Sequence, residues 1–266
     1  MDRLLFVYDL ENDSLWSDGL QAALKLLESS FKIDYLNLQN SNHSLNGYDF
    51  VLGWGAFGSR VDNTLKNYLG KKGLCLGGNA TPVPYIDYDI IFYETKWVKN
   101  NYLNRAEHKK TTRFVHAFGT NTQIYKPLNL SPVIDYLTIG AFALWKNQRM
   151  ILKKNGIKMA IGQIQRGNLS ESLDIIGDLM LGGCIISDMI PPKKLAKFYN
   201  LSRIVYLPCD IIGGGERAVL EAKACGIPVE VENDKLKEIK DSPILWDEKY
   251  YKSQLKNAIK YELSKK

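Results

Sequence analysis

The sequence lacks long hydrophobic runs and contains few cysteines and few histidines. None of its apolar stretches reaches the ~18 residues that a membrane-spanning helix needs, so we expect no integral membrane span. The opening residues, MDRLLFVYDLEND, turn acidic too early for a secretory signal peptide. The 4 cysteines are scattered, without a C-x-x-C pair or a nearby histidine, which argues against a zinc site or a disulfide framework. Isolated thiols suit a reducing compartment, and we predict a cytoplasmic protein.

The overall composition is that of a globular protein with a substantial core. The chain has 266 residues, of which 45% are hydrophobic and 24% charged, a length that allows one large domain or two smaller ones. Its net charge is +6, carried mainly by lysine. This excess has two readings: a Lys- and Asn-rich composition set by an AT-rich genome, or an anionic partner such as DNA, a phosphate polymer or a membrane surface.

Short apolar runs alternate with helical patterns along the first half of the chain. Helices are expected at 17–30 and 60–70, and strands at 4–10, 32–38, 49–55, 73–78, 88–94 and 112–119. This alternation is typical of a parallel sheet covered by helices.

The pattern restarts after the proline-containing segment 121–132, which marks a domain boundary. Helices are expected at 146–156, 170–181 and 191–200, with Ser170 as a cap, and strands at 135–142, 157–163, 182–188 and 203–209. We therefore predict an α/β protein with two Rossmann-like parallel-sheet domains facing a cleft, comprising residues 1–125 and 126–245. Residues 246–266 are expected to form a C-terminal helix that packs back on the first domain.

The glycine-rich stretch IIGGGERAVLEAKACGIPVEV, residues 211–231, follows the last long strand. Gly213, Gly214 and Gly215 are expected to open a helix, where free backbone N–H groups favour an anion such as a diphosphate. Glu221 would then lie ~10 Å along the axis, within reach of an attached ribose. The alternative is an ordinary turn followed by a surface ion pair between Arg217 and Glu221. The stretch matches neither a P-loop nor G-x-G-x-x-G.

Residues 213–231 resemble the donor-site segment of the GT-B glycosyltransferases, especially glycosyltransferase family 4. That family's pattern is roughly E-G-x-G-x-x-x-x-E-A-x-A-x-G-x-P-V, and its second half is matched by Glu221, Ala222, Ala224, Gly226, Pro228 and Val229. Segment 139–146, IGAFALWK, resembles the family's G-R-x-x-x-x-K through Gly140 and Lys146. Segments 118–127 and 190–209 resemble the family's linker and its Tyr-strand-Pro-Ser segment, and the likeness extends over about residues 85–240.

Four departures from the family pattern concern residues of the expected site. Gly213 stands where the family has its first Glu, with Glu216 three residues later. Ala141 replaces the family's Arg, and Arg149 or Arg217 are candidates to compensate. Cys209 stands in place of the Ser, and Asn121 in place of the linker's Asp.

The resemblance implies a transferase that moves a sugar from a nucleotide sugar such as UDP-glucose, with retention and without a metal or other cofactor. Lys146 and Glu216 are the expected catalytic residues. The donor-binding set is expected to comprise Gly140, Lys146, Gly213, Gly214, Gly215, Glu216, Arg217 and Glu221. The acceptor stays open, with a DNA base in a viral or phage context as one class. A non-catalytic nucleotide-sugar-binding protein and a GT-B nucleotide-sugar epimerase are the alternatives.

Several residues near strand ends in the first half are candidates for the acceptor side: Asp18, Gly19, Trp54, Gly55, Phe57, Glu94 and His116. The aromatic rings of Trp54 and Phe57 could stack on a sugar or base, or pack within a loop. His116 could act as a general base or be a hydrogen-bonded structural residue. Asp87 and Asp89 form a D-x-D pattern, which we interpret as the start of a strand rather than a metal site.

Overall fold

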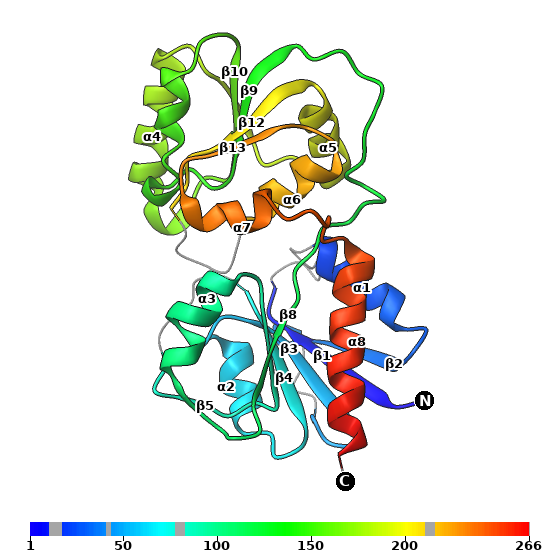
Figure 1. Cartoon of the computed structure of the whole chain (residues 1–266). Coiled ribbons are helices and arrows are strands. Elements are labelled where there is room, and N and C mark those ends of the chain that lie inside the picture. The colour runs from blue at the N-terminus through cyan, green and yellow to red at the C-terminus, as the bar shows by residue number, and fades with distance from the viewer. Residues whose placement is uncertain (11–17, 41–43, 78–82, 211–215, 266) are drawn as a thin grey trace. The chain divides into compact units, whose positions relative to one another are not determined.

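The computed structural model describes residues 1–10, 18–40, 44–77, 83–210 and 216–265. These residues divide into two compact units (Figure 1). Residues 1–119 and 246–265 belong to unit 1, and residues 120–210 and 216–245 belong to unit 2. The C-terminal segment is therefore part of the same unit as the N-terminus.

Unit 1 is built on a parallel sheet of six strands in the order β2-β1-β3-β4-β6-β8. The strands are β1 (Arg3–Tyr8), β2 (Lys32–Asn37), β3 (Phe50–Gly55), β4 (Lys72–Leu76), β6 (Ile90–Tyr93) and β8 (Arg113–His116). Two short strands, β5 (Tyr85–Ile86) and β7 (Glu107–His108), pair with each other in a separate ladder. All six predicted strands of this half are present, and the predicted parallel α/β architecture is confirmed.

Helices cover both faces of this sheet, which explains the unbroken apolar runs of its strands. Leu4 and Phe6 of β1 pack in one cluster with α1 (Asp18–Leu27) and α8 (Glu248–Ser264), which lie side by side in Figure 1. The alternate residues Leu5 and Val7 pack in a second cluster, which includes side chains of α2 (Arg60–Lys66) and α3 (Lys96–Asn101). The apolar side of α8 is thus buried in the core of unit 1.

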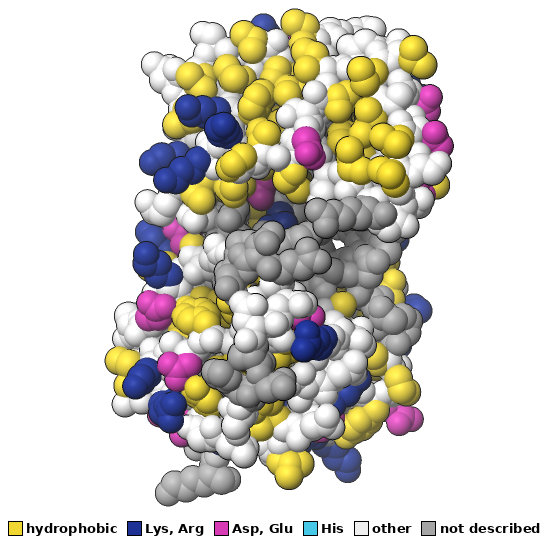
Figure 2. All heavy atoms as spheres, turned by 180° about the vertical axis from the view of Figure 1, so that it is seen from behind, with side chains coloured by type: hydrophobic (Ala, Val, Ile, Leu, Met, Phe, Trp, Pro, Cys, Tyr) yellow, Lys and Arg dark blue, Asp and Glu magenta, His cyan; other side chains and the backbone are white. Residues whose placement is uncertain are grey.

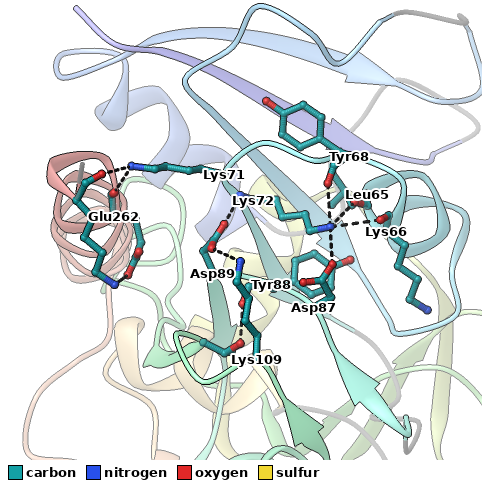
Figure 3. Close-up of polar contacts among 12 residues, drawn as sticks. Leu65, Lys66, Tyr68, Lys71, Lys72, Asp87, Tyr88, Asp89, Lys109 and Glu262 are labelled. Atoms are coloured by element: carbon teal, nitrogen blue, oxygen red, sulfur yellow. Dashed lines mark hydrogen bonds and ion pairs between the residues drawn. The ribbon is translucent and has the colours of Figure 1, made fainter.

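Two adjacent lysines donate hydrogen bonds to the backbone carbonyl groups at the C-terminal ends of two different helices (Figure 3). Lys72, only 4% exposed, donates from Nζ to the carbonyl oxygens of Leu65 (3.1 Å) and Tyr68 (3.0 Å) at the end of α2. Lys71 donates to the carbonyl oxygens of Glu262 (2.6 Å) and Lys265 (2.7 Å) at the end of α8. The last carbonyls of a helix have no partner within the helix, so these ammonium groups replace lost hydrogen bonds.

The two aspartates of the D-x-D pattern belong to the same charged network. Asp87 pairs with Lys72 Nζ (3.2 Å), and Asp89 pairs with Lys109 Nζ (3.0 Å) while accepting from the backbone N–H of Lys72 (2.9 Å). Asp89 directly precedes β6. Each carboxylate is thus held by a lysine of the fold, Asp89 at the start of β6 and Asp87 just after β5.

Unit 2 is built on a parallel sheet of five strands in the order β11-β10-β9-β12-β13. The strands are β9 (Ile134–Ile139), β10 (Lys158–Gly162), β11 (Ile185–Asp188), β12 (Ser202–Leu207) and β13 (Val229–Val231). The helices are α4 (Leu169–Leu181), α5 (Pro192–Asn200), α6 (Arg217–Ala224) and α7 (Lys237–Lys240). Proline in the first turn of α5 needs no backbone N–H there.

The helix predicted over 146–156 is wrong. Two 3₁₀ helices occupy this region, η2 (Leu144–Lys146) and η3 (Gln148–Lys153), separated by Asn147 at a φ of 49°. Asparagine tolerates this left-handed conformation, and here its side chain is held by the carbonyl oxygen of Pro208 (3.4 Å) and by Asp210 Oδ2 (3.3 Å). The predicted cap of α4 is also shifted: Asn168, not Ser170, occupies the N-cap position.

Part of the surface of unit 2 is strongly apolar. Hydrophobic side chains gather on the face of this unit seen in Figure 2. Several apolar side chains on α4, on the edge strand β11 and directly after it are more than half exposed: Leu169, Leu173, Met180, Leu181, Ile185 and Met189. No helix among the described residues is long and apolar enough to cross a membrane.

Candidate functional site

A lysine–glutamate pair lies at the carboxyl edge of the sheet of unit 2. Lys146 ends η2, which follows β9, and Glu216 occupies the N-cap position of α6, which follows β12. Strands β9 and β12 are parallel neighbours, so the segments that leave them emerge at the same edge. There the ammonium group of Lys146 donates to Glu216 Oε2 in a short ion pair. Ligands of open α/β sheets bind at this edge.

The pair is largely withdrawn from water. The side chains of Lys146 and Glu216 are 9% and 14% exposed. The ammonium group also lies 4.4 Å from the ring centroid of Trp145, within cation–π range. Gly140 has a φ of +144°, and a Cβ at this position would lie 2.9 Å from Lys146 Cε. A glycine is therefore required for Lys146 to lie along the backbone after β9.

Cys209 adds a second donor to the same carboxylate oxygen. Its Sγ lies 3.6 Å from Glu216 Oε2. Burial, reinforced by the negative charge of Glu216, raises the pKa of the Cys209 thiol to about 12. The thiol is therefore neutral at pH 7 and can donate its proton to Glu216. The cysteine that replaces the family's serine keeps a donor at this position.

Glu221, in α6, is a buried carboxylate. It is 7% exposed and accepts a hydrogen bond of 2.6 Å from the hydroxyl of Tyr199, at the end of α5. The Tyr199 ring packs edge-on against Tyr125, with ring centroids 5.8 Å apart. Burial, with the nearby charge of Glu221, raises the pKa of Tyr199 well above its usual value, so the phenol stays a donor. Tyr199 was not among the predicted site residues, although it ends the helix of a segment that resembles the family.

The beginning of α6 differs from the prediction. The helix starts at Arg217, with Glu216 before it, so Glu221 lies about 6 Å along the axis from the first helical residue rather than ~10 Å. Gly213, Gly214 and Gly215 lie outside the described residues. Arg217 is half-buried in the first turn of α6.

Gln148 is a further residue beside Gly140 that sequence reasoning missed. Its Nε2 donates to the carbonyl oxygen of Gly140 (3.1 Å), and its side-chain oxygen is buried without a hydrogen-bond partner among the described residues. Nothing in the local sequence singles out this glutamine, because it reaches Gly140 only through the two 3₁₀ turns. It fixes the backbone against which Lys146 lies.

His116, at the end of β8 in unit 1, uses both ring nitrogens inside the fold. Its Nε2 lies 3.1 Å from the carbonyl oxygen of Glu94, which can only accept, so Nε2 carries the proton. Its Nδ1 therefore accepts from the Tyr250 hydroxyl of α8, 2.7 Å away. The ring also packs edge-on against Trp246, at 4.4 Å between centroids. Burial, with a smaller effect of Lys96, lowers the pKa of His116 to about 4. This geometry fits the hydrogen-bonded structural alternative.

The aromatic and glycine residues of 53–58 mainly serve the packing of unit 1. Phe57 is 6% exposed within the core, so its ring is not presented to a ligand, and Trp54 packs partly buried against the other core cluster. A Cβ on Gly53 would lie 2.4 Å from Leu65 Cδ1, and one on Gly55 would lie 2.8 Å from Ser59 Oγ. The absence of a Cβ at these glycines makes room for side chains of the following helix and its cap.

The remaining candidates of unit 1 are placed as follows. Asp18 and Gly19 lie in the first turn of α1, not in a loop, and Gly19 is buried. Glu94 follows β6 and is half-buried. Among the residues that the structure describes, no three His, Cys, Asp or Glu side chains are grouped to hold a metal ion.

Comparison with known proteins relates the chain to solved glycosyltransferase structures. No protein-family model and no curated protein matches the sequence. The sucrose-phosphate synthase of Thermosynechococcus elongatus is similar over 99% of this chain and 90% of that chain, with 13% identity and a TM-score of 0.65. Anabaena HepE in complex with UDP and glucose is similar over 100% and 90%, with 11% identity and a TM-score of 0.65. A glycosyltransferase from Rickettsia africae is similar over 99% and 95%, with 12% identity and a TM-score of 0.57. Together with two parallel α/β units, these likenesses show that the chain has the GT-B glycosyltransferase fold.

Proposed function

We propose that the protein is a glycosyltransferase that binds a nucleotide-sugar donor in unit 2 and transfers its sugar to an acceptor. The observation that carries the proposal is the buried lysine at the carboxyl edge of the sheet, held against Gly140 and paired with Glu216. The fold supports it, and so does the occurrence of UDP and UDP-glucose in structures of a protein with the same fold, Anabaena HepE.

In this proposal, Lys146 binds the diphosphate of the donor. When the glycosidic bond to the diphosphate breaks, negative charge accumulates on the leaving oxygen. An ammonium group fixed in a water-poor site stabilises this charge without reorganising. Trp145 and Gly140 hold the lysine in place before the donor arrives. A diphosphate must compete with Glu216 for this cation, so donor binding frees the Glu216 carboxylate.

We assign Glu216 the part of the family's first Glu, which is missing at position 213. Its support is geometric: the carboxylate contacts the lysine that the resemblance implies in diphosphate binding. Once released, this carboxylate can accept hydroxyl groups of the transferred sugar. In the same unit we expect Glu221, which accepts a hydrogen bond from Tyr199, to bind the ribose diol. Retention and independence from metal follow from the resemblance and are part of the proposal.

A panel of nucleotide sugars tests the proposal directly. A donor present at ~100 times its Kd should stabilise the protein by ~2.7 kcal/mol, visible as a raised Tm. Release of UDP from UDP-glucose, with and without EDTA, then tests turnover and metal independence, and NMR of the product tests retention. Binding without release of the nucleotide would favour the non-catalytic alternative, which the unusual Ala141 and Gly213 also suggest. Absence of binding across the panel would refute both.

The acceptor is predicted only as a class. An anionic acceptor, with DNA as one candidate, is one of the two interpretations of the net charge of +6. A gel-shift series at increasing salt measures this, because binding through phosphates weakens steeply with salt. No shift of duplex DNA at low salt would exclude the nucleic-acid acceptor while leaving donor binding untouched.

A further inference from the structure

Unit 1 contains a hollow of about 350 Å³ whose lining residues are not among the candidate site residues discussed above. Its lining consists of Val83, Trp97, Asn101, Tyr102, Arg105 and Ala106. The volume falls at the lower end of the range found for ligand pockets, which suits a single ring rather than an oligomer. None of these residues belongs to the proposed donor site.

The walls of the hollow belong to elements that also pack against the core of unit 1. Val83 precedes β5, and Arg105 and Ala106 precede β7. The parallel β5–β7 ladder, Tyr85 with Glu107 and Ile86 with His108, ties these two walls together. The third wall is α3, whose first turn is capped by Thr95, with Oγ1 accepting from the Val98 N–H at 3.4 Å. These contacts hold the three walls through backbone pairing and a helix cap.

Two aromatic rings make up much of the apolar surface. Trp97 and Tyr102 meet edge to face, with centroids 5.3 Å apart and an interplanar angle of 69°. Both rings also pack against the core cluster beneath them, which fixes their orientation. Fixed aromatic rings offer flat apolar surfaces to the C–H face of a sugar.

Among the lining side chains, Asn101 carries an amide and Arg105 a guanidinium. Asn101 donates from Nδ2 to the carbonyl oxygen of Trp97 (2.9 Å), which orients its Oδ1 as an acceptor for a hydroxyl. Arg105 is exposed and forms no ion pair with any carboxylate among the described residues. A guanidinium without a carboxylate partner can bind a carboxylate or phosphate through two parallel hydrogen bonds.

We propose that this hollow binds a monosaccharide that carries an anionic group, with the ring against Trp97 and Tyr102 and the anion on Arg105. A phosphate ester and a uronic acid share this chemistry. The proposal does not depend on glycosyl transfer, because it concerns binding to unit 1 alone.

Calorimetric titration of the full chain tests the proposal with four probes: glucose 6-phosphate, glucuronate, glucose and inorganic phosphate. We expect one or both anionic sugars to bind more tightly than glucose and than phosphate. Binding of the phosphate ester alone, of glucuronate alone, or of both identifies the source of the anion, and each supports the proposal. Phosphate binding as tightly as glucose 6-phosphate would overturn it, and so would no binding of either anionic sugar below about 10 mM.

Three variants locate the binding site. Arg105→Gln should lower the affinity for the anionic sugar at least ~10-fold, because a charged hydrogen bond is lost. Lys110 is an exposed cation outside the hollow, and Lys110→Gln should change this affinity less than about twofold. Ala106→Phe should abolish binding by filling the hollow, with thermal unfolding as the check on folding. Lys146→Met should leave it unchanged. Loss of anionic-sugar binding in Lys146→Met, or unchanged binding in Arg105→Gln, would show that the sugar binds elsewhere and would refute the proposed location.

Discussion

A double-mutant cycle on Lys146 and Glu216 tests the charge arrangement of the proposed donor site. Lys146→Met leaves a carboxylate that is 14% exposed with only the Cys209 thiol, 3.6 Å away, as a donor contact among the contacts described above. Removing one partner of a buried pair costs ~3–5 kcal/mol, and the residual exposure favours the lower end, ~3 kcal/mol. Glu216→Gln should cost less, ~1–2 kcal/mol, because the ammonium keeps the face of Trp145 at 4.4 Å.

The double variant removes both charges and should lose no more than ~2 kcal/mol, which gives a coupling energy of ~2 kcal/mol. Urea unfolding at pH 7, followed by circular dichroism, measures all four proteins. The exposed pair Arg149–Asp178, with side chains 38% and 54% exposed, provides the control cycle and should couple by ~0.2–1 kcal/mol. Additive losses at Lys146 and Glu216, with coupling below ~0.5 kcal/mol, would refute the reasoning.

The same two single variants separate binding from chemistry. Glu216→Gln frees Lys146 from its competitor, so we expect UDP to bind at least as tightly as in the unmodified protein, while transfer falls. Lys146→Met removes the cation, and UDP affinity should fall ~10-fold or more. Weaker UDP binding in Glu216→Gln would show that this carboxylate supports the diphosphate site rather than competing with it.

Three further predictions concern single residues. Gly140→Ala should lower the unfolding free energy by ~1–3 kcal/mol, because φ is +144° and the new Cβ meets Lys146. Gly177→Ala in α4, where no atom lies within 4 Å of the new Cβ, should instead raise the unfolding free energy by ~0.5–1 kcal/mol. Equal shifts of the two variants in thermal unfolding would contradict this. Tyr199→Phe should cost ~1.5–3 kcal/mol in urea, because the buried carboxylate of Glu221 loses a 2.6 Å donor, and an unchanged midpoint would be inconsistent with that bond. The pKa of His116 is about 4 in the folded protein and ~6.5 in the unfolded chain, so between these pH values the unfolded state binds one more proton. The unfolding free energy should therefore fall by at most ~3 kcal/mol as the pH drops from 6.5 to 4. This pH dependence should disappear in His116→Gln; the same pH dependence in the variant and the unmodified protein would contradict the assignment to His116.

The alternation of strands and helices was readable from the sequence because each local pattern agrees with the final packing. The run LLFVY has no polar alternation, and both faces of β1 are indeed buried, Leu4 and Phe6 on one side and Leu5 and Val7 on the other. Prediction failed at 146–156, where the apolar spacing suggested an α-helix. The left-handed Asn147, stabilised by Asp210 and Pro208 from a distant loop, divides this segment into 3₁₀ turns.

The candidate site, too, combines features that the sequence predicted with a contact that it could not predict. The segment around Glu221 and the spacing of Gly140 and Lys146 were enough to predict a nucleotide-sugar site and the GT-B fold, and the fold is confirmed by solved structures. The contact between Lys146 and Glu216 was not predictable, because it joins residues 70 positions apart through two neighbouring strands. The site roles themselves stay predictions.

By itself, the sequence determined the local elements and the parallel architecture, since both depend on hydrophobic periodicity and on which residues end helices and strands. Only the tertiary structure decided which polar groups meet. It brought Glu216 into contact with Lys146 and gave both ring nitrogens of His116 a hydrogen-bond partner. It also packed the Leu65 side chain against Gly53 and formed the hollow beside Arg105 by pairing β5 with β7. These contacts depend on the register of strands and on side-chain directions, which single residues do not encode.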